Sequence, residues 1–486
     1  MTTSSPQGVA TPVSVVASGI LSPASVVDTA VLPQRLRSAR RVRQLTQPEV
    51  AKRSGLSQSQ ISRLESGQTS DPAFSTVAAV ARALGVSLDA IAAPDGDEFL
   101  RQINRDEDAL DNTVAVGLST TTGAPVAVAR FLQPHVATPH MLIVGARESG
   151  APAAAKLDLI RWTQQQVPAA VVDDRGEYRA IAEAHNGRVI ALGAGDILNV
   201  MDFSAPAYGP NSLASKVSAV TRFLMGLIGS GAQTKQQRAA VEDIVWGVYR
   251  RRGFSTAAFS GVVACGPTNA PTLGDVHTAA THAAGHEDGR AQLARILADA
   301  LAPYVGDGAY AELFDAKTTV SDAHSSPLVV FDLSAVPAGA RRAAASVAVE
   351  QTRAWWVTRP ADRGDRRLLY ITNLDELTGD PYTGEQAAGL VRRARDCGVG
   401  VTLIAHDTNT LTTEVGQEIA AKCAHQIVLR PDTVGRSVLT AQFGLTGHEA
   451  DLAAQAPVGR ALLVAGEKKS WVDVQGAATP DELALL

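Results

Sequence analysis

Two glycines separated by four residues stand where a phosphate group could be bound. Residues 141–144 (MLIV) predict a buried strand, Gly145 and Gly150 follow it, and a helical pattern begins directly afterwards. Such a loop holds nucleotide phosphates through its backbone N–H groups when Lys and then Ser or Thr follow the second glycine. In this chain Ala151 and Pro152 take those two places. The side chains that would contact the β/γ-phosphates and Mg²⁺ are therefore missing.

Two further features of this segment weaken phosphate binding. Pro152 has no N–H group to offer to a phosphate. Lys156 cannot replace the missing lysine, because its offset along the helix corresponds to ~7.5 Å of rise and to another side of the helix. The remaining loop N–H groups could still cradle a phosphate. We therefore predict no cofactor, with ATP binding possible but not expected.

A pair of acidic residues later in the chain is a second candidate for chemistry. Asp375 and Glu376 follow the apolar run RRLLYI, where a strand is expected to end and a helix to begin. Without any ligand, such a pair favours the positive end of the helix dipole. His406 follows the run GVTLIA and could act as a base, although a lone histidine after a buried strand is more often a structural donor.

The elements that would position these residues alternate along the chain. Short apolar runs, among them HMLIVG, AAVVD, RVIAL, PLVVFDL, RRLLYI and GVTLIA, are separated by longer Ala-rich helical stretches. Alternating strand and helix patterns predict an α/β domain with a mainly parallel sheet.

The composition fits a globular protein of the cytoplasm. Of the 486 residues, 45% are hydrophobic and 19% charged, no apolar run is long enough to cross a membrane, and the first twenty residues lack the charged start of a secretion signal. The three cysteines are far apart and form no metal-binding spacing, so we expect them to be reduced. We expect no membrane partner.

The order of several short blocks is more specific than any one of them. After the loop come VVDDRGEY, GRVIAL and LNVMD, then LFDAKTTV with LVVFDLS, and finally RRLLYITNLDEL, RRARDCGVGVTLIAH and QIVLRPD. This succession, over roughly residues 125–475, resembles the HerA–FtsK class of ring-forming P-loop motors, and most closely the ATPases of conjugative (type IV) DNA transfer. The resemblance implies a RecA-like fold.

The same resemblance implies roles for residues outside the loop. Asp375 and Glu376 match an acidic pair that positions Mg²⁺ and the attacking water, a role that we weigh equally with the dipole interpretation. Arg395 matches a position linked to ring contacts or γ-phosphate sensing, whereas His406 lies where the family has Thr-Gln. Without the loop lysine, a main source of transition-state stabilisation is lost. We therefore predict a pseudo-ATPase without catalytic residues or a metal site, and a degenerate nucleotide site formed by Gly145, Gly150, Ala151, Pro152, Asp375, Glu376 and Arg395.

A second region, residues 31–93, has its own charge and its own helix signals. It holds nine Lys or Arg against four acidic residues, a net charge of +5 that leaves −10 for the rest of the chain, which indicates an anionic partner for this region alone. Thr46 with Glu49 and Ser57 with Gln60 form capping boxes of two helices that are only a few residues apart. This spacing predicts a helix-turn-helix within a five-helix unit.

The region resembles the lambda-repressor/Cro-like (XRE) family of DNA-binding domains through Leu45-Thr46-Gln47, Gly55-Leu56-Ser57, Ile61-Ser62 and Leu64-Glu65-x-Gly67. The resemblance implies that the helix beginning after Ser57 enters the major groove, and that Gln47 bonds a backbone phosphate. A protein-interaction module with a solvated basic face is the alternative, but polar side chains at the base-reading positions favour DNA. The predicted DNA-binding residues are Gln47, Ser57, Gln58, Ser59, Gln60, Ser62 and Arg63.

The complete sequence predicts an α+β multidomain protein. Its parts are a disordered tail (1–30), an all-α XRE-type helix-turn-helix domain (31–93), a linker (94–124), a degenerate conjugation-ATPase-like P-loop domain (125–475) and a C-terminal tail (476–486). We expect a nucleoid-associated transcription regulator, a repressor of a mobile genetic element, that binds a pseudo-palindromic double-stranded DNA operator as a homo-oligomer. Three alternatives are a motor subunit of conjugative DNA transfer, an ATP-responsive regulator that still binds nucleotide, and a scaffold anchored to the chromosome.

Overall fold

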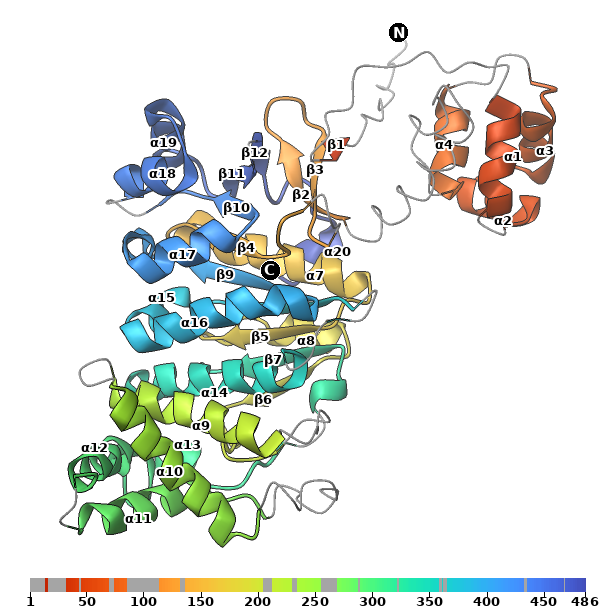
Figure 1. Ribbon diagram of the computed structural model, residues 1–486. Helices are drawn as coiled ribbons and strands as arrows, with labels where there is room; N and C mark the ends of the chain where they lie inside the picture. Colours follow the sequence, from red (N-terminus) through yellow and green to blue (C-terminus); the bar gives the residue numbers. More distant parts are fainter. Residues whose placement is uncertain are drawn as a thin grey trace. The chain divides into compact units, whose positions relative to one another are not determined.

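The computed structural model separates the chain into two compact units (Figure 1). The helix-turn-helix region belongs to the smaller unit and residues 137–486 to the larger one, and each is described by itself. The described residues are 14–15, 32–42, 45–69, 74–84, 113–131, 136–203, 212–229, 234–254, 269–286, 289–320, 323–357, 361, 365–431, 435–466 and 468–486.

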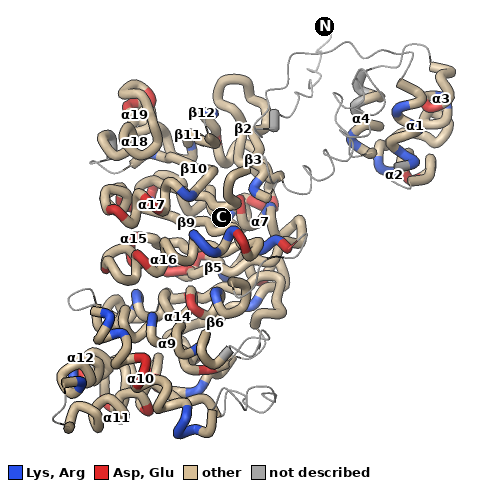
Figure 2. Tube along the Cα trace, in the orientation of Figure 1, with Lys and Arg blue, Asp and Glu red and all other residues tan. Residues whose placement is uncertain are grey.

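Four helices are described in the smaller unit: α1 (Leu32–Val42), α2 (Gln47–Ser54), α3 (Gln58–Ser66) and α4 (Phe74–Leu84). Their apolar faces form one core, in which the fully buried Leu36, Val50 and Ile61 come from three different helices. Figure 2 marks basic positions of this unit along α1 and α2, and Arg63 and Arg82 add one each on α3 and α4. The fifth helix predicted from the sequence lies outside the described residues.

One mostly parallel sheet organises the larger unit. Its strands are β1 (Ser14–Val15), β2 (Thr113–Ser119), β3 (Pro125–Ala129), β4 (Met141–Val144), β5 (Ala169–Asp173), β6 (Arg188–Ala191), β7 (Leu328–Asp332), β8 (Arg367–Ile371), β9 (Val399–Ala405), β10 (His425–Val428), β11 (Arg460–Ala465) and β12 (Lys468–Asp473). Their order is β1-β3-β2-β12-β11-β10-β4-β9-β8-β5-β7-β6. The strands from β10 to β6 pair in parallel, whereas β2, β12, β11 and β10 pair antiparallel.

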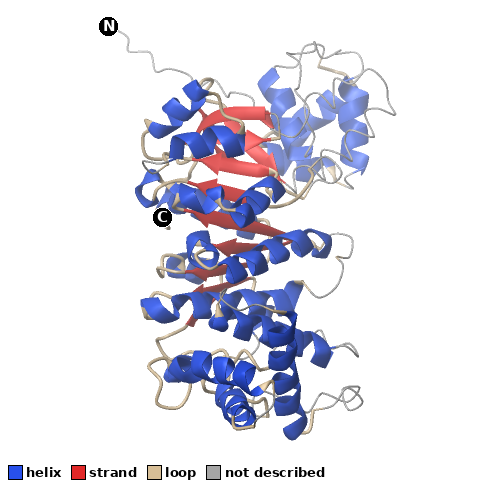
Figure 3. Ribbon diagram, turned by 60° about the vertical axis from the view of Figure 1, so that its left-hand side comes forward, coloured by secondary structure: helices blue, strands red, loops and turns tan. Residues whose placement is uncertain are grey.

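The burial of the strands explains why helices must cover the sheet. Every residue of β4, β5, β7 and β9 is buried, as expected for parallel strands with helices on both faces. Figure 3 shows the strands between the helices. These helices are α7 (Ala151–Gln164), α8 (Arg179–Ala184), α9 (Ser212–Ile228), α10 (Lys235–Arg251), α11 (Leu273–Ala284), α12 (Ala291–Leu301), α13 (Ala311–Phe314), α14 (Ala338–Trp356), α15 (Leu374–Thr378), α16 (Pro381–Ala394), α17 (Glu414–Lys422), α18 (Gly435–Phe443), α19 (Gly447–Ala454) and α20 (Pro480–Leu483).

The six apolar runs named above all form strands, so the predicted α/β architecture with a mainly parallel sheet is confirmed. An additional feature is a helical lobe, α9 to α13, inserted between β6 and β7, in which α9 packs on α10 and α11 packs on α12 (Figure 1). Because the lobe joins the same hydrophobic core as the sheet, it belongs to the larger unit.

Two predicted boundaries differ from the structure. The predicted linker 94–124 is too long, because residues 113–119 form β2 and pair with β12. The predicted C-terminal tail 476–486 contains α20, whose buried Glu482 forms an ion pair with Arg161. Both segments are stabilised by partners that are distant in the sequence, which a local pattern does not reveal. Residues 94–112 of the predicted linker and all of the N-terminal tail except β1 lie outside the described residues.

Candidate functional site

Two complete capping boxes build the helix-turn-helix. The Thr46 hydroxyl accepts the N–H of Glu49, and the Glu49 carboxylate accepts the Thr46 N–H at 2.7 Å. Ser57 and Gln60 repeat this exchange at the start of α3. Gly55 ends α2 with a φ of 72°, a left-handed conformation that favours glycine. The turn between α2 and α3 is therefore set by local sequence.

Buried and exposed residues divide α3 into two faces. Ile61 and Leu64 are buried in the core of the smaller unit. Residues three or four positions apart share a face of a helix, so the polar residues at the start of α3 form one surface. Its exposed members, all assigned to base contacts from the sequence, are Gln58, Ser59, Ser62 and Arg63.

Two other predicted DNA-binding residues take part in the cap of α3. The Gln60 side-chain oxygen accepts hydrogen bonds from the Ser57 N–H at 2.8 Å and the Ser57 hydroxyl at 3.0 Å. Both side chains are exposed. Their first role in this structure is therefore to hold the helix N-terminus, while the amide nitrogen of Gln60 remains for other partners.

Gln47 is tied to α3 by a buried carboxylate. Glu65 accepts hydrogen bonds from Arg40 at 2.7 and 2.8 Å and from the Gln47 amide at 3.0 Å. Burial alone would raise the pKa of Glu65, but the hydrogen bonds from Arg40 and Gln47 outweigh it, so the pKa lies below its ordinary value. Glu65 therefore stays charged and links α1, α2 and α3. Glu65 matches the family pattern, but it is not among the DNA-binding residues predicted from the sequence.

Two backbone N–H groups of the loop between β4 and α7 donate hydrogen bonds to carbonyls of the protein itself. Its residues 147–149 form a short 3₁₀-helix, in which the Ser149 N–H donates to the Ala146 carbonyl at 2.8 Å. The Ala146 N–H donates to the Arg430 carbonyl at 2.9 Å. Because both N–H groups already donate to backbone carbonyls, they are not free to bind a phosphate.

Both glycines of the loop are explained by close packing. A Cβ atom at Gly145 would lie 2.5 Å from the Ser149 hydroxyl and 2.8 Å from the Leu429 Cβ. A Cβ atom at Gly150, whose φ is 99°, would lie 2.9 Å from the Gly459 backbone nitrogen. Neither position accepts a side chain without movement of its neighbours.

The residues that replace the lysine and the hydroxyl begin α7. Ala151 is fully buried, and Pro152 fits the first helical turn because the N–H that it lacks is not needed there. Lys156 points to other partners: its Nζ donates to the Leu486 main-chain oxygen at 2.7 Å and lies 3.6 Å from the Glu177 carboxylate. No described contact brings Lys156 to the loop.

The Asp375 carboxylate is occupied by hydrogen bonds from the segment after β9. It accepts from the N–H groups of His406 and Asp407 at 2.9 and 3.2 Å and from the Thr410 hydroxyl at 2.6 Å. Burial raises the pKa of Asp375, while the Thr410 hydrogen bond opposes this shift. Asp375 therefore fastens α15 to the end of β9.

His406 acts as a structural donor in this arrangement. Its Nε2 lies 3.1 Å from the Thr372 carbonyl, so the proton of the neutral ring belongs on Nε2. Burial and the nearby charge of Arg147 lower the pKa of His406. The imidazole is therefore neutral at pH 7, as the structural interpretation requires.

A cavity of about 430 Å³ lies beside the loop. Glu376 is 3.8 Å from the Arg342 guanidinium, and Arg147 is 3.7 Å from the Asp174 carboxylate. Residues of the loop and of the acidic pair thus line the same cavity. The lining residues are Ala146, Arg147, Arg342, Asn373, Asp375, Glu376, His406 and Asp407.

Both parts of the chain are similar to known proteins. Residues 36–91 match the helix-turn-helix family model HTH_3. They form an XRE-type helix-turn-helix domain. VirB4 of Thermoanaerobacter pseudethanolicus is 20% identical, with a TM-score of 0.64 over 76% of this chain and 97% of that chain. The plasmid coupling protein TrwB, solved with the ATP analogue ADPNP, is 12% identical, with a TM-score of 0.51 over 70% of this chain and 86% of that chain.

These structures show that the larger unit shares the fold of VirB4 and TrwB, and the predicted RecA-like α/β fold is confirmed. Identities this low establish the fold alone. No curated protein matches the chain. Within the described ranges, no helix combines the length and the apolar character that crossing a bilayer demands.

Within the RecA-like unit, Arg395 lies apart from the other predicted site residues. Arg395 is exposed and begins a short 3₁₀-helix just before β9, whereas the cavity lies at the other end of that strand. The seven residues of β9 span about 20 Å. Arg395 therefore cannot reach the cavity of its own chain.

Sequence reasoning missed several cavity residues. Arg147 lies inside the glycine loop, so its position was available from the sequence, but no motif marks a basic residue there. Arg342 comes from α14 and reaches Glu376 only through the packing of α14 against α15. No spacing in the sequence could have predicted that contact.

Proposed function

We propose that this chain is a sequence-specific transcription regulator that represses genes of a mobile genetic element. The observation that carries the proposal is the exposed polar surface at the start of α3, on a helix-turn-helix whose caps are complete. Gln can bond adenine and Arg can bond guanine through two hydrogen bonds each. The setting in a mobile element is supported by the likeness of the larger unit to VirB4 and TrwB.

The larger unit, in this proposal, does not hydrolyse ATP. Ala151 and Pro152 replace the lysine and the hydroxyl, and the Ser149 and Ala146 N–H groups donate within the protein. Asp375 already accepts three hydrogen bonds, so a metal ion would have to displace them. The RecA-like unit instead supplies oligomerisation and a place for a signal or partner.

Oligomerisation gives the helix-turn-helix its affinity. Two such domains in one homo-oligomer bind the two halves of a pseudo-palindromic operator far more tightly than one, because the second contact is intramolecular. We place this protein in the cytoplasm, associated with the nucleoid.

The decisive experiment maps the DNA that the full chain binds and then alters α3. With the double variant Gln58→Ala and Arg63→Ala, we expect preference for the operator over random DNA to fall at least tenfold, since each two-bond base contact contributes ~1–3 kcal/mol. Arg82→Ala, which removes an exposed positive charge from α4, is the matched control and should keep the preference. Unchanged specificity in the double variant, measured by gel shift, would show that α3 does not read the bases.

A second candidate function is that of a motor subunit in conjugative DNA transfer. The observation that favours it is that Asp375 and Glu376 remain beside the loop in a fold shared with VirB4 and TrwB. ATP hydrolysis stimulated by DNA would support this candidate, whereas footprints over the protein's own promoter, with derepression on deletion, support the regulator.

A further inference from the structure

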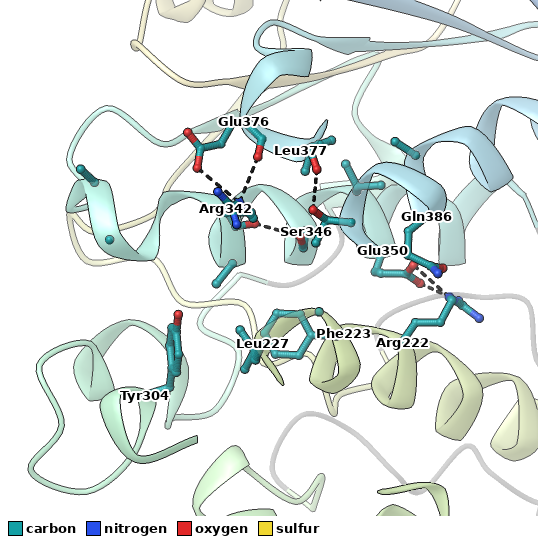
Figure 4. A pocket seen from close by; sticks show the side chains of 17 residues that line it. Arg222, Phe223, Leu227, Tyr304, Arg342, Ser346, Glu350, Glu376, Leu377 and Gln386 are labelled. Carbon is teal, nitrogen blue, oxygen red and sulfur yellow. Dashed lines mark hydrogen bonds and ion pairs between the residues drawn. The ribbon is translucent and has the colours of Figure 1, made fainter. Parts of the chain in front are cut away.

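A second cavity, of about 270 Å³, lies between α9, α14, α15 and α16. Figure 4 shows an ion pair at each end of it, Arg342 with Glu376 and Arg222 with Glu350. The cavity is separate from the glycine loop, none of whose residues line it.

The pair at one end is fully engaged. Arg222 donates to both Glu350 oxygens at 3.1 and 2.7 Å and to the Ser218 hydroxyl at 3.3 Å. Arg353 also reaches Glu350, at 3.4 Å. Two arginines thus share one carboxylate, which leaves an excess of positive charge at this end.

At the other end of the cavity, Arg342 has N–H groups that are available to a ligand. The Arg342 Nε donates to the Glu376 main-chain oxygen at 3.1 Å and is 3.8 Å from the Glu376 carboxylate. Among the described residues, neither of its terminal Nη groups donates a hydrogen bond, and 42% of the side chain is exposed. A guanidinium with two uncommitted Nη groups is a ready partner for a carboxylate or phosphate group.

Apolar and aromatic side chains form the wall between the two ends. Figure 4 shows Phe223, Leu227 and Tyr304 on this wall. The Tyr304 ring is fixed by Phe314, whose centroid lies 5.3 Å away in an edge-on contact, and by Tyr310 at 5.5 Å. Rings that are held in place offer a preformed surface to a flat ligand.

We propose that this cavity binds a small organic anion with a flat apolar body. Its carboxylate or phosphate group lies on the Arg342 guanidinium, and its body packs against Phe223, Leu227 and Tyr304. The excess positive charge at Arg222 and Arg353 favours the same sign of ligand. The use of this ligand as the signal of a regulator rests on the proposed function, whereas its binding does not.

The position of Arg342 gives the ligand a route to the rest of the molecule. Arg342 and Glu376 line both this cavity and the one beside the glycine loop. An anion that engages Arg342 competes with the long contact to Glu376 and so favours the arrangement in which the two separate. Occupancy of one cavity thereby changes the charges presented to the other.

The test measures binding to the full-length protein by equilibrium dialysis, without DNA, so that it does not depend on the regulator function. The probes are 1-naphthyl phosphate and 2-naphthoate, with inorganic phosphate as the anion that lacks an apolar body. Arg342→Gln removes the proposed anion contact, and Ser346→Phe fills the cavity from α14. Arg392→Gln, which removes an exposed arginine of α16 outside the cavity, is the matched control.

We expect at least one naphthyl probe to bind ten times more tightly than inorganic phosphate. Arg342→Gln should weaken that binding at least tenfold and Ser346→Phe should abolish it, with no change in Arg392→Gln. Two outcomes would overturn the proposal: neither naphthyl probe binds, or both cavity variants bind as the natural protein does. The preference between the carboxylate and the phosphate identifies the class of anion.

Discussion

At the scale of single residues, Glu65 decides how the recognition helix is held. It is buried on α3, and its carboxylate joins Arg40 of α1 to Gln47 of α2. Because the folded state lowers the pKa of Glu65, the unfolded chain binds more protons than the folded one as the pH falls. The stabilisation is therefore complete above the ordinary pKa of 4.5 and is lost as the pH falls through the lower folded value.

Glu65→Gln should destabilise the helix-turn-helix domain by about 2 kcal/mol, the contribution of a hydrogen-bonded charge. Hydrogen exchange of the α1–α3 amides in the full chain measures this change. The difference from the natural protein should begin to shrink below about pH 4.5, the ordinary pKa, and should vanish once the pH falls below the lower pKa of the folded state. Lys52→Ala, at an exposed site on α2, is the control and should leave hydrogen exchange unchanged. If the amides of Glu65→Gln are as protected as those of the natural protein, the Glu65 network does not stabilise the domain.

At the scale of elements, Arg161 joins three segments that are far apart in the sequence. It pairs with Glu482 of α20 at 2.8 Å and donates to the carbonyls of Ala115 in β2 and Ala477 at 2.7 and 3.2 Å. Burial alone would raise the pKa of Glu482, but the hydrogen bonds from Arg161 and Thr479, together with the charge of Arg161, outweigh it, so the pKa is lowered. These contacts attach β2 and α20 to α7.

Glu482→Gln should destabilise the larger unit by about 3 kcal/mol, because Arg161 is left as a buried charge without its counterion. Calorimetry should show a lower Tm for this unit. Glu449→Gln breaks a surface pair with Lys469 and should cost at most about 1 kcal/mol. Equal Tm shifts in the two variants would contradict a special role for the buried pair.

At the scale of the whole molecule, the question is whether a chain that shares its fold with VirB4 and TrwB hydrolyses ATP. We expect no turnover by the natural chain, with or without DNA. Ala151→Lys together with Pro152→Ser should be required before any hydrolysis is seen, since they restore the phosphate and Mg²⁺ contacts. A colorimetric phosphate assay on the full chain checks both statements. Turnover by the natural protein at the rate of an active motor, lost on Glu376→Gln, would contradict the proposed inactivity.

Much of this protein could be predicted from the sequence because the signals are local. The capping pairs Thr46–Glu49 and Ser57–Gln60 fix the helix-turn-helix through contacts within four residues. The largely apolar runs, such as residues 399–405, favour buried strands of a parallel sheet. Ala151 and Pro152, which take the places of the lysine and the hydroxyl residue, can be read from the loop sequence directly.

Only the tertiary structure decided the rest, because it depends on contacts between distant residues. In the folded chain, Asp375 accepts hydrogen bonds from the segment after β9, and Arg342 lies beside Glu376. Arg395 is separated from the cavity by the length of β9. It also placed the segments around β2 and α20 in the larger unit through Arg161. Sequence spacing measures distance along the chain, and packing brings side chains together regardless of that distance.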